Sequence, residues 1–274
     1  MIIREMTTLD DFQACVNLQK IIWGFDDPYD VVPLPLLMIS ARNDGVVLGA
    51  YEDKEMIGFV YGLPGFHKGK KVQWSHMLAV KPDKQNSDIG YQLKIAQYKM
   101  SQERGYELIE WTYDPLESRN AHFNLRKLGC IIKEYEINIY GETSSHLHKG
   151  SPTDRFIAHW QIPPLKKTED FKQLPDDSIL VTQSVRGEDG FLRIQNVKLD
   201  RNDPVLFVEI PENTQALKAK LPDEGLRWRL QTRAIFTHYF DRGYVAYTFL
   251  HWKETSPSRS FYVLKKADKI ESLI

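Results

Sequence analysis

The sequence has only two cysteines, no long apolar run and no excess of charge of either sign. Cys15 and Cys130 cannot form a disulfide framework, which favours a reducing, cytoplasmic setting. No apolar stretch approaches the roughly 20 residues that cross a membrane, and residues 1–11 contain no apolar signal region. We therefore expect a cytoplasmic protein without a membrane partner.

The charge balance and the histidine spacing argue against two further classes. Lys and Arg number 36 and Asp and Glu 37, so the chain as a whole lacks the basic excess of a nucleic-acid-binding protein. His146 and His148 lie two apart in a polar loop, but no Cys or His pair has the spacing of a zinc site. We expect no nucleic-acid partner and no metal.

The central stretch, residues 71–129, predicts a strand-loop-helix-strand-helix unit. Residues 72–80 form the first strand, a helix begins at 88–90 and ends at Gly105, a strand follows over 107–113, and a helix covers 118–129. A helix that begins after a polar loop presents unpaired backbone N–H groups and a positive dipole end. Such a helix start suits a phosphate-bearing ligand.

Before this unit, the sequence predicts a short strand at Ile2, a helix capped by Thr7 or Thr8, a helix over 36–42 and two strands over 46–51 and 56–63. A strand follows the unit over 130–141. The element order to this point is β-α-α-β-β-β-α-β-α-β.

A change to polar, Gly- and Ser-rich sequence after residue 141 marks a predicted boundary. We divide the chain into a domain over 1–142, a connecting segment over 143–178 and a smaller α+β portion over 179–274. The last portion is predicted to contain strands over 179–185, 191–197 and 205–210, a helix over 225–241, and paired strands over 244–252 and 259–264.

The first part resembles the GNAT superfamily of acyl-CoA-dependent N-acyltransferases. In that family a strand ending Val-x-Pro precedes a loop of the form Arg/Gln-x-x-Gly-x-Gly/Ala. Here Val80-Lys81-Pro82 is followed by Gln85 and Gly90 in register, while Asp88 replaces the first glycine. The resemblance implies an α+β fold with a mixed, splayed central sheet flanked by helices, and acyl-CoA (acetyl-CoA or succinyl-CoA) as co-substrate.

Carried onto this sequence, the resemblance places CoA contacts on the strand end, the loop and two helix starts: Leu78, Ala79, Val80, Gln85, Asn86, Ser87, Asp88, Ile89, Gly90, Tyr91 and Asn120. Two interpretations of Asp88 stay open. Its carboxylate either caps its own helix, away from the pyrophosphate, or marks a loop that has lost CoA binding. Asn120 either contacts the CoA arm or only caps its helix.

Proton transfer is assigned to His76 as base and, with less support, to Tyr113 as acid. The position where the family often has a tyrosine acid is occupied by Leu125. A structural role for His76, satisfied by cross-strand hydrogen bonds, is the alternative. Asp114 either orients an amine or caps the next helix, and His67 lies in a Gly-rich turn.

Three arginines, Arg227, Arg229 and Arg233, fall on or near one face of the helix predicted over 225–241. They either bind an anionic group of a substrate or pair with carboxylates elsewhere in the protein.

The whole chain also looks like a GNAT subgroup with an extra C-terminal portion, carried by the motifs WTYDPLESRNA and DRFIAHW. Some members of that subgroup are thought to be amino-acid N-succinyltransferases. We therefore expect an enzyme that acylates the amine of a small molecule, possibly an amino acid, by direct attack on acyl-CoA. The alternative is a catalytically inactive GNAT-fold sensor or interaction protein. The oligomeric state stays open.

Overall fold

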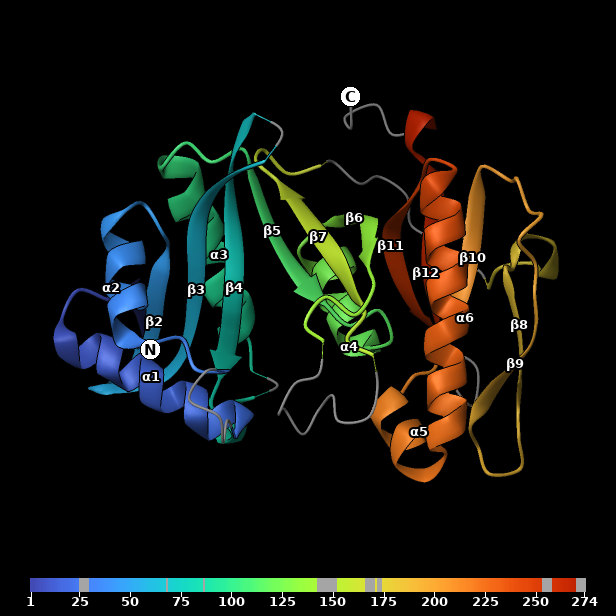
Figure 1. Cartoon of the computed structure of the whole chain (residues 1–274), viewed down its shortest axis with the longest axis horizontal. Helices are drawn as coiled ribbons and strands as arrows, with labels where there is room; N and C mark the ends of the chain where they lie inside the picture. The colour runs from blue at the N-terminus through green and yellow to red at the C-terminus, as the bar shows by residue number, and fades with distance from the viewer. Residues whose placement is uncertain are drawn as a thin grey trace. The chain divides into compact units, whose positions relative to one another are not determined.

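The computed structural model describes residues 1–24, 30–67, 69–85, 87–141, 152–165, 171, 174–252 and 258–269 (Figure 1). The chain divides into two compact units, and the division falls between Trp111 and Thr112. The first unit contains residues 1–111 and 161–163, and the second contains 112–141, 152–160 and the chain from 164 onward. Each unit is described by itself.

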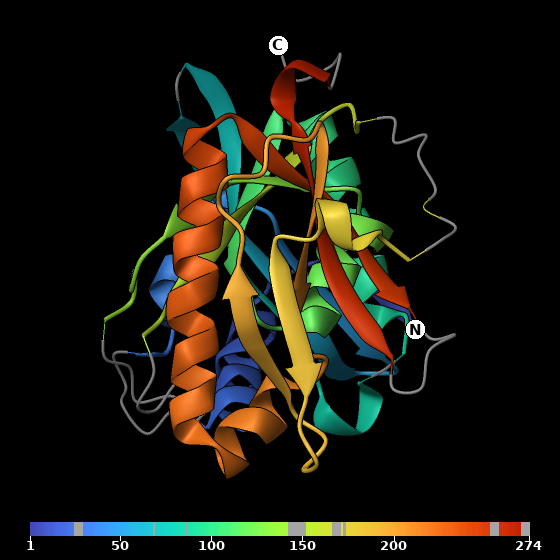
Figure 2. The same ribbon diagram turned by 90° about the vertical axis from the view of Figure 1, so that its right-hand side faces the viewer.

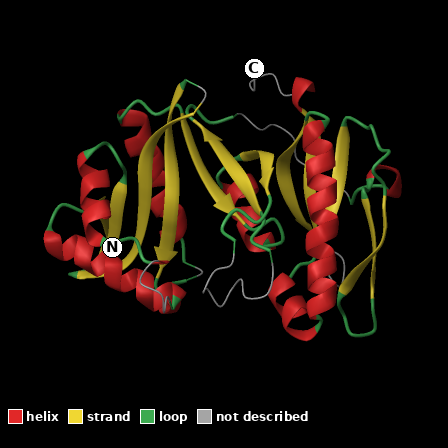
Figure 3. Ribbon diagram, in the orientation of Figure 1, coloured by secondary structure: helices red, strands yellow, loops and turns green. Residues whose placement is uncertain are grey.

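The first unit is an α+β layer structure. Its elements are β1 (Ile2–Glu5), α1 (Leu9–Trp23), α2 (Leu34–Arg42), β2 (Val47–Glu52), β3 (Glu55–His67), β4 (Lys70–Val80), α3 (Ile89–Glu103) and β5 (Leu108–Tyr113), which crosses into the second unit. The strands lie in the order β1-β2-β3-β4-β5. Helices α1 and α2 cover one face of these strands and α3 covers the other (Figure 3).

The sheet of the first unit is mixed. Strands β1 to β4 pair in antiparallel fashion, whereas β4 and β5 pair in parallel through Val72–Trp74 and Leu108–Glu110. The register of β3 with β4 shifts by one residue between the pairs Tyr61↔Met77 and Gly62↔Ser75, so that His76 is an extra residue in β4. Such a β-bulge places two successive side chains on one face of the strand.

Helix α3 buries polar and apolar residues on the same face. Ile89 and Leu93 pack with Leu78 and Val80 beyond the bulge, as their helical spacing predicts. Before the bulge, β4 presents Gln73 and Ser75 to α3, and these side chains meet a second group of buried polar residues: Lys94, Gln97 and Ser101. The bulge therefore separates an apolar contact from a hydrogen-bonded one.

The second unit contains α4 (Ser118–Ala121), which continues as a π-helical turn over His122–Lys127, then β6 (Ile131–Glu136), β7 (Arg155–Gln161), β8 (Thr182–Arg186), β9 (Leu192–Val197), β10 (Val205–Ile210), α5 (Thr214–Lys220), α6 (Pro222–Asp241), β11 (Tyr244–Trp252) and β12 (Arg259–Lys266). The strand order is β7-β6-β11-β12-β10, and β8 and β9 form a separate pair. Helix α6 runs beside β9 (Figure 2).

Aromatic rings form the centre of the second unit. Phe156 of β7 lies 4.7 Å from Phe236 of α6 and 5.4 Å from Tyr262 of β12, measured between ring centroids. Both contacts are edge-to-face, the geometry that the ring quadrupole favours. These rings join the helix to strands that are far apart in sequence, and all three residues are fully buried.

The predicted α+β class and the element order up to β6 are confirmed. Three elements differ from expectation: β7 and α5 were not predicted, and β3 extends to His67 through the stretch read as a turn. The division proposed near residue 142 stays a prediction, while the compact units divide within β5. No helix among the described residues is long and apolar enough to cross a membrane.

Asp11 holds the start of α1 to β1 and β2. Its carboxylate, 6% exposed, accepts two hydrogen bonds from Arg4 at 2.9 and 2.7 Å, one from Tyr51 at 2.8 Å and one each from the N–H groups of Thr7 and Thr8 at 3.1 Å. The Arg4 hydrogen bonds hold the pKa of Asp11 far below its usual value of 3.8, because they favour the charged carboxylate.

We predict that Asp11→Asn destabilises the protein by about 1–3 kcal/mol, since an amide cannot accept this set of bonds. Because the folded pKa is depressed, the contribution of Asp11 is complete above pH 3.8 and is lost as the pH falls below it. Urea unfolding of both proteins from pH 7 to pH 3 measures this. Asp10→Asn, at an exposed site in the same turn, is the control, and an equal effect of both substitutions would contradict the assignment.

Candidate functional site

His76 occupies the bulge of β4 on the α1/α2 face of the first unit. Its ring stands edge-on to Tyr61 at 5.9 Å between centroids, and the Tyr61 hydroxyl is hydrogen-bonded to Ser40 Oγ at 2.8 Å. The side chain reaches solvent, yet the surrounding protein lowers the pKa of His76 from 6.5 by desolvating the imidazolium. A neutral, accessible imidazole at neutral pH can accept a proton.

The cross-strand alternative for His76 finds no support in the described residues, none of which forms a hydrogen bond or ion pair with its ring. Beyond His76, β4 continues to Leu78, Ala79 and Val80, which lie opposite Val60, Phe59 and Gly58 of β3. Within the first unit, no residue of β5 pairs with this last part of β4. The backbone of Leu78–Val80 therefore has β3 on one side only in that unit.

The loop after β4 is held by side-chain bonds to the β2–β3 hairpin and by a bond within the loop. The Nζ atoms of Lys81 and Lys84 pair with Glu55 and Glu52 of the β2–β3 hairpin, the second pair at 2.6 Å. Within the loop, Ser87 Oγ donates to the Lys84 carbonyl at 2.5 Å. Both lysines are therefore paired with carboxylates of the β2–β3 hairpin in this structure. Asn86 lies outside the described residues.

Gln85 and Asp88 begin and end the short segment that leads into α3. Gln85 Nε2 donates weakly to the Val80 carbonyl at 3.4 Å. The Asp88 carbonyl accepts from Gln92 N–H at 2.9 Å, but the Asp88 carboxylate makes no capping hydrogen bond. Of the two interpretations of Asp88, the one in which its side chain caps α3 is therefore wrong. Its backbone angles, φ −76° and ψ 7°, differ from the extended conformation that lets an N-cap side chain reach N2 or N3.

The first turn of α3 offers backbone donors. The N–H groups of Ile89 and Tyr91 donate to no described residue, as expected for a helix start without a side-chain cap. At Gly90, an added Cβ would have Val80 Cγ2 as its nearest neighbour, at 3.8 Å, so packing within the protein does not require glycine there. The glycine instead leaves the helix start open to a close-approaching group.

Lys94 is a buried cation that the sequence reading missed. Its Nζ donates to Gln97 Oε1 at 2.7 Å and Ser75 Oγ at 3.1 Å, and lies 3.6 Å from the centroid of the Trp111 ring. A sequence signal for this burial exists. Lys94, Gln97 and Ser101 recur at helical spacing on one face of α3, and they face the polar residues of β4. This charge lies directly behind the part of β4 that carries His76.

His67, which the sequence analysis placed in a turn, belongs to a strand and has a carboxylate partner. It ends β3, and its Nδ1 lies 3.3 Å from Oε1 of Glu110 on β5. The Glu110 side chain is only 5% exposed, whereas His67 is 39% exposed. A buried carboxylate that orients a half-exposed imidazole is an arrangement suited to proton transfer at the other ring nitrogen.

The remaining predicted residues lie in the second unit. Tyr113 is buried with its ring 5.7 Å from Phe156, and burial raises its pKa far above 10, an environment typical of a core tyrosine. Asn120 is exposed in α4, where Glu117 rather than Asn120 has the N-cap position. Leu125 is fully buried in the π-helical turn. Tyr113 and Asn120 stay predictions as site residues.

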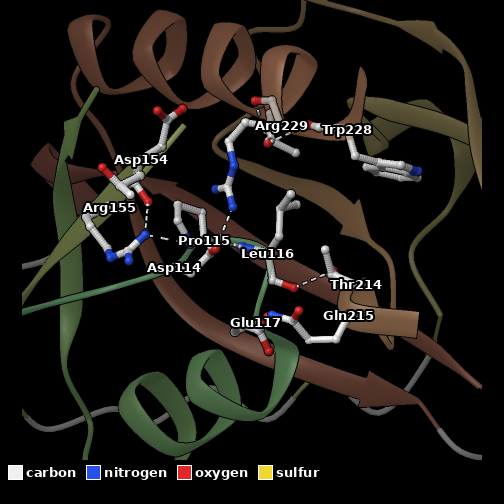
Figure 4. Close-up of polar contacts among 12 residues, drawn as sticks. Asp114, Pro115, Leu116, Glu117, Asp154, Arg155, Thr214, Gln215, Trp228 and Arg229 are labelled. Carbon is white, nitrogen blue, oxygen red and sulfur yellow. Dashed lines mark hydrogen bonds and ion pairs between the residues drawn. The ribbon is translucent and has the colours of Figure 1, made fainter. Parts of the chain in front are cut away.

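Asp114 lies in a buried ion-pair cluster (Figure 4). Its carboxylate accepts from Arg229 Nη2 at 2.5 Å and from Leu116 N–H at 2.8 Å, and it does not cap α4, whose N-cap residue is Glu117. Arg233 pairs with Asp154 at 2.8 Å. For these two arginines, pairing with carboxylates of the protein is the interpretation that the structure supports.

Comparisons with known proteins found similarity to solved structures alone. Neither a protein-family model nor a curated protein matches the chain. A GNAT-family acetyltransferase from Streptococcus pneumoniae matches it at 14% identity and a TM-score of 0.47, covering 58% of this chain and 98% of that one. An aminoglycoside 6′-acetyltransferase type Ii matches at 20% identity and a TM-score of 0.47, covering 61% and 100%.

A third match is a Thermoplasma acidophilum N-acetyltransferase solved in complex with coenzyme A, at 15% identity and a TM-score of 0.41, covering 58% of this chain and 98% of that one. All three matched proteins are described as acetyltransferases, the first of them as a member of the GNAT family. As the resemblance predicted, this chain continues beyond the part that they cover.

No cluster of three or more His, Cys, Asp or Glu side chains in the described residues is arranged to hold a metal ion. His146 and His148, considered as a weak candidate pair, lie outside the described residues.

We predict that the imidazole of His76 titrates below pH 6.5, because the surrounding protein desolvates its charged form and lowers its pKa. A pH titration of the histidine Cε1–H resonances by NMR measures this, with His76→Gln identifying the resonance. A midpoint at or above 6.5 would show that a nearby carboxylate, rather than desolvation, governs this residue.

Proposed function

We propose that the protein is an acyl-CoA-dependent N-acyltransferase that acylates the amine of a small molecule. The observation that carries this proposal is the sequence of features along one chain segment of the first unit. A bulge presents His76, and the strand end Leu78–Val80 follows. Next comes a helix start with Gly90, where the N–H groups of Ile89 and Tyr91 donate to none of the residues that the structure describes. A base, a polarising backbone and an anion site thus lie in order on one strand-loop-helix unit.

The donor would be held by its pyrophosphate at the start of α3. The N–H groups of Ile89 and Tyr91 and the positive end of the helix dipole suit phosphate oxygens. The Asp88 carboxylate opposes this binding, but in a solvated loop the repulsion is screened by salt. Acetyl-CoA and succinyl-CoA share this part of the molecule, so the loop does not discriminate between them.

The reaction would be a direct transfer. The amine nitrogen attacks the thioester carbonyl carbon, a C–N bond forms, and the tetrahedral intermediate collapses with cleavage of the C–S bond to release CoA thiolate. An N–H group of Leu78–Val80 would stabilise the oxyanion by hydrogen bonding. The attacking nitrogen carries a proton that must leave before or during the collapse, and the released thiolate takes up a proton from solvent or a nearby acid.

His76 is the proposed base, directly or through a water that it holds. Its lowered pKa keeps it neutral at pH 7, so it can accept the amine proton without first losing one. The imidazole of His67, paired with Glu110, is a second candidate base in the same unit. It is the group to examine if His76 proves dispensable.

The first experiment is a thermal-shift titration with CoA, acetyl-CoA and succinyl-CoA, followed by an assay of thiol release with a panel of amines. Ligand binding to the folded state raises the melting temperature as the ligand concentration exceeds Kd. Binding with amine-dependent thiol release supports the enzyme. Binding without release from any amine supports the sensor, and the absence of binding refutes both.

For the loop, we predict that Gly90→Trp weakens CoA binding at least tenfold, because the side chain would occupy the approach to the helix start. Gly90→Ala should fold with equal or up to about 1 kcal/mol greater stability, since alanine favours the helix and its Cβ has room. Isothermal titration of CoA and urea unfolding measure these effects. Lys99→Trp, at an exposed site further along α3, is the control. Unchanged affinity in Gly90→Trp would exclude this placement of the pyrophosphate.

For the base, we predict that His76→Gln lowers kcat at pH 7 by about 100-fold, the lower end of the range for general base catalysis, with little change in CoA affinity. The loss should shrink at high pH, where more of the amine is already neutral. His238→Gln, a histidine of the second unit bonded to the Leu199 carbonyl, is the control. A pH-independent loss equal in kcat and binding would indicate a structural role instead.

A further inference from the structure

The imidazole of His67 has a buried carboxylate at one nitrogen and no described partner at the other. Its Nδ1 lies 3.3 Å from Oε1 and 3.4 Å from Oε2 of Glu110. Because an ionised carboxylate only accepts hydrogen bonds, the proton of the neutral ring belongs on Nδ1. The lone pair is then on Nε2, with which no residue that the structure describes forms a hydrogen bond. Nε2 is therefore the position at which His67 takes up a proton.

Glu110 and His67 meet across strand β4. Strands β3 and β5 pair with β4 on opposite sides, and Glu110 is the partner of Trp74. Gln73, the residue before Trp74, is bonded to α3, so the alternation along the strand turns Trp74 to the other face of the sheet. The register places His67 and Glu110 on this same face, and the bulge presents His76 there as well.

Trp74 lies between the His67–Glu110 pair and His76. Glu110 is one strand away from Trp74, about 5 Å between backbones, and His76 is two residues further along β4, about 7 Å. The Trp74 side chain is only half-buried. Two imidazoles thus border one partly exposed tryptophan, a surface over which a small amine has a base on either side.

The charges around His67 favour its protonated form. Glu110 is buried and negative, and its charge balances that of a ring that gains a proton. Lys70 lies opposite His67 in the β3–β4 pairing and is exposed, so solvent and salt screen its charge. Tyr61 and His76 are titratable side chains further along the same face, at the bulge.

Acylation of an alkylamine removes two protons from its nitrogen. At pH 7 the amine is an ammonium ion, which has no lone pair, so one proton must leave before the attack. A second leaves the cationic nitrogen of the tetrahedral intermediate, which is a much stronger acid than the ammonium ion. Desolvation lowers the pKa of His76, so this ring is a weak base for the first proton but strong enough for the second.

We propose that His67 takes the first proton and His76 the second. The N–H bond of the bound ammonium ion breaks, Nε2 of His67 gains the proton, and the nitrogen keeps the electron pair. Glu110 balances the imidazolium charge, and the half-exposed ring returns the proton to solvent. The neutral amine then attacks the thioester, and His76 removes the second proton as the C–S bond breaks. This division rests on the proposed acyl transfer, for which Glu110 is a positioning residue.

The test compares two acceptors that differ mainly in protonation. One is the alkylamine that gives the fastest thiol release in the panel, and the other is the alkoxyamine with oxygen in place of the CH₂ group next to nitrogen. At pH 7 the first is an ammonium ion and the second is neutral. We expect His67→Gln to lower kcat/KM for the alkylamine about tenfold or more and to leave that for the alkoxyamine unchanged. His76→Gln should lower both.

Phe66→Gln is the control, because Phe66 precedes His67 on the opposite face of the strand and is 80% exposed. It should leave both acceptors unchanged. As the pH rises from 7 to about 10, more of the alkylamine is neutral, and the deficit of His67→Gln should shrink. An equal loss with both acceptors would show a structural role for His67, and no loss with the alkylamine would also overturn the proposal.

Glu110→Gln tests the positioning residue, since it keeps the shape of the side chain but cannot balance an imidazolium charge. It should lower kcat/KM for the alkylamine alone, again about tenfold. A ¹⁵N NMR spectrum of the imidazoles, recorded at a pH where the rings are neutral, gives a readout that needs no activity. We expect the His67 proton on Nδ1, with His67→Gln identifying the signals. A ring with its proton on Nε2 would overturn the proposal even if Glu110→Gln fails to fold.

The two proposals fail in different ways. If no amine causes thiol release from any acyl-CoA, the proposed acyl transfer fails, and the division of protons fails with it. If the wild-type protein acylates alkylamines and His67→Gln does so at the same rate, acyl transfer stands and only the role of His67 is refuted.

Discussion

The one-residue bulge at His76 is the constraint on which the first unit depends. Because side chains alternate along a strand, an extra residue exchanges the faces of everything beyond it. Before the bulge, β4 turns polar residues to α3, and these are satisfied by Lys94, Gln97 and Ser101. Beyond it, β4 turns Leu78 and Val80 to the same helix, against Ile89 and Leu93. Helix α3 can cover both the polar and the apolar part of β4 because its own buried face changes from apolar to polar at the level of the bulge.

The second unit is organised by buried ion pairs instead of a bulge. Asp114 follows β5 directly and is bonded to an arginine 115 positions later in the chain, while Asp154 accepts from Arg233 one turn further along α6. Replacing one partner of such a pair leaves a buried charge uncompensated, which is usually more harmful than the pair is beneficial. Segments that are far apart in sequence are therefore held together by specific ion pairs as well as by apolar packing.

Much of this arrangement followed from the sequence because it is local. The helices α1 and α3, the hairpin strands and the Gln85–Gly90 loop are specified by periodicity, turn residues and a short motif. What escaped prediction depends on partners distant in sequence. Lys94 and Glu110 read as ordinary charged residues, and their burial requires Ser75 and His67, which only the fold brings to them. Likewise, Asp88 looked like a helix cap because its residue type is right, whereas its backbone angles prevent it.

The strand β6 has a consequence for how the protein is made. Its partners are β7 and β11, so one of its edges is completed only when a segment roughly 100 residues further on has been synthesised. At the usual speed of translation, that interval is roughly 5–20 s. During it, the nascent chain carries a strand with an open edge, which is prone to pair with other chains. The elements of the first unit, in contrast, are nearly all contained in residues 1–111, so this unit can fold on the ribosome before its neighbour is complete.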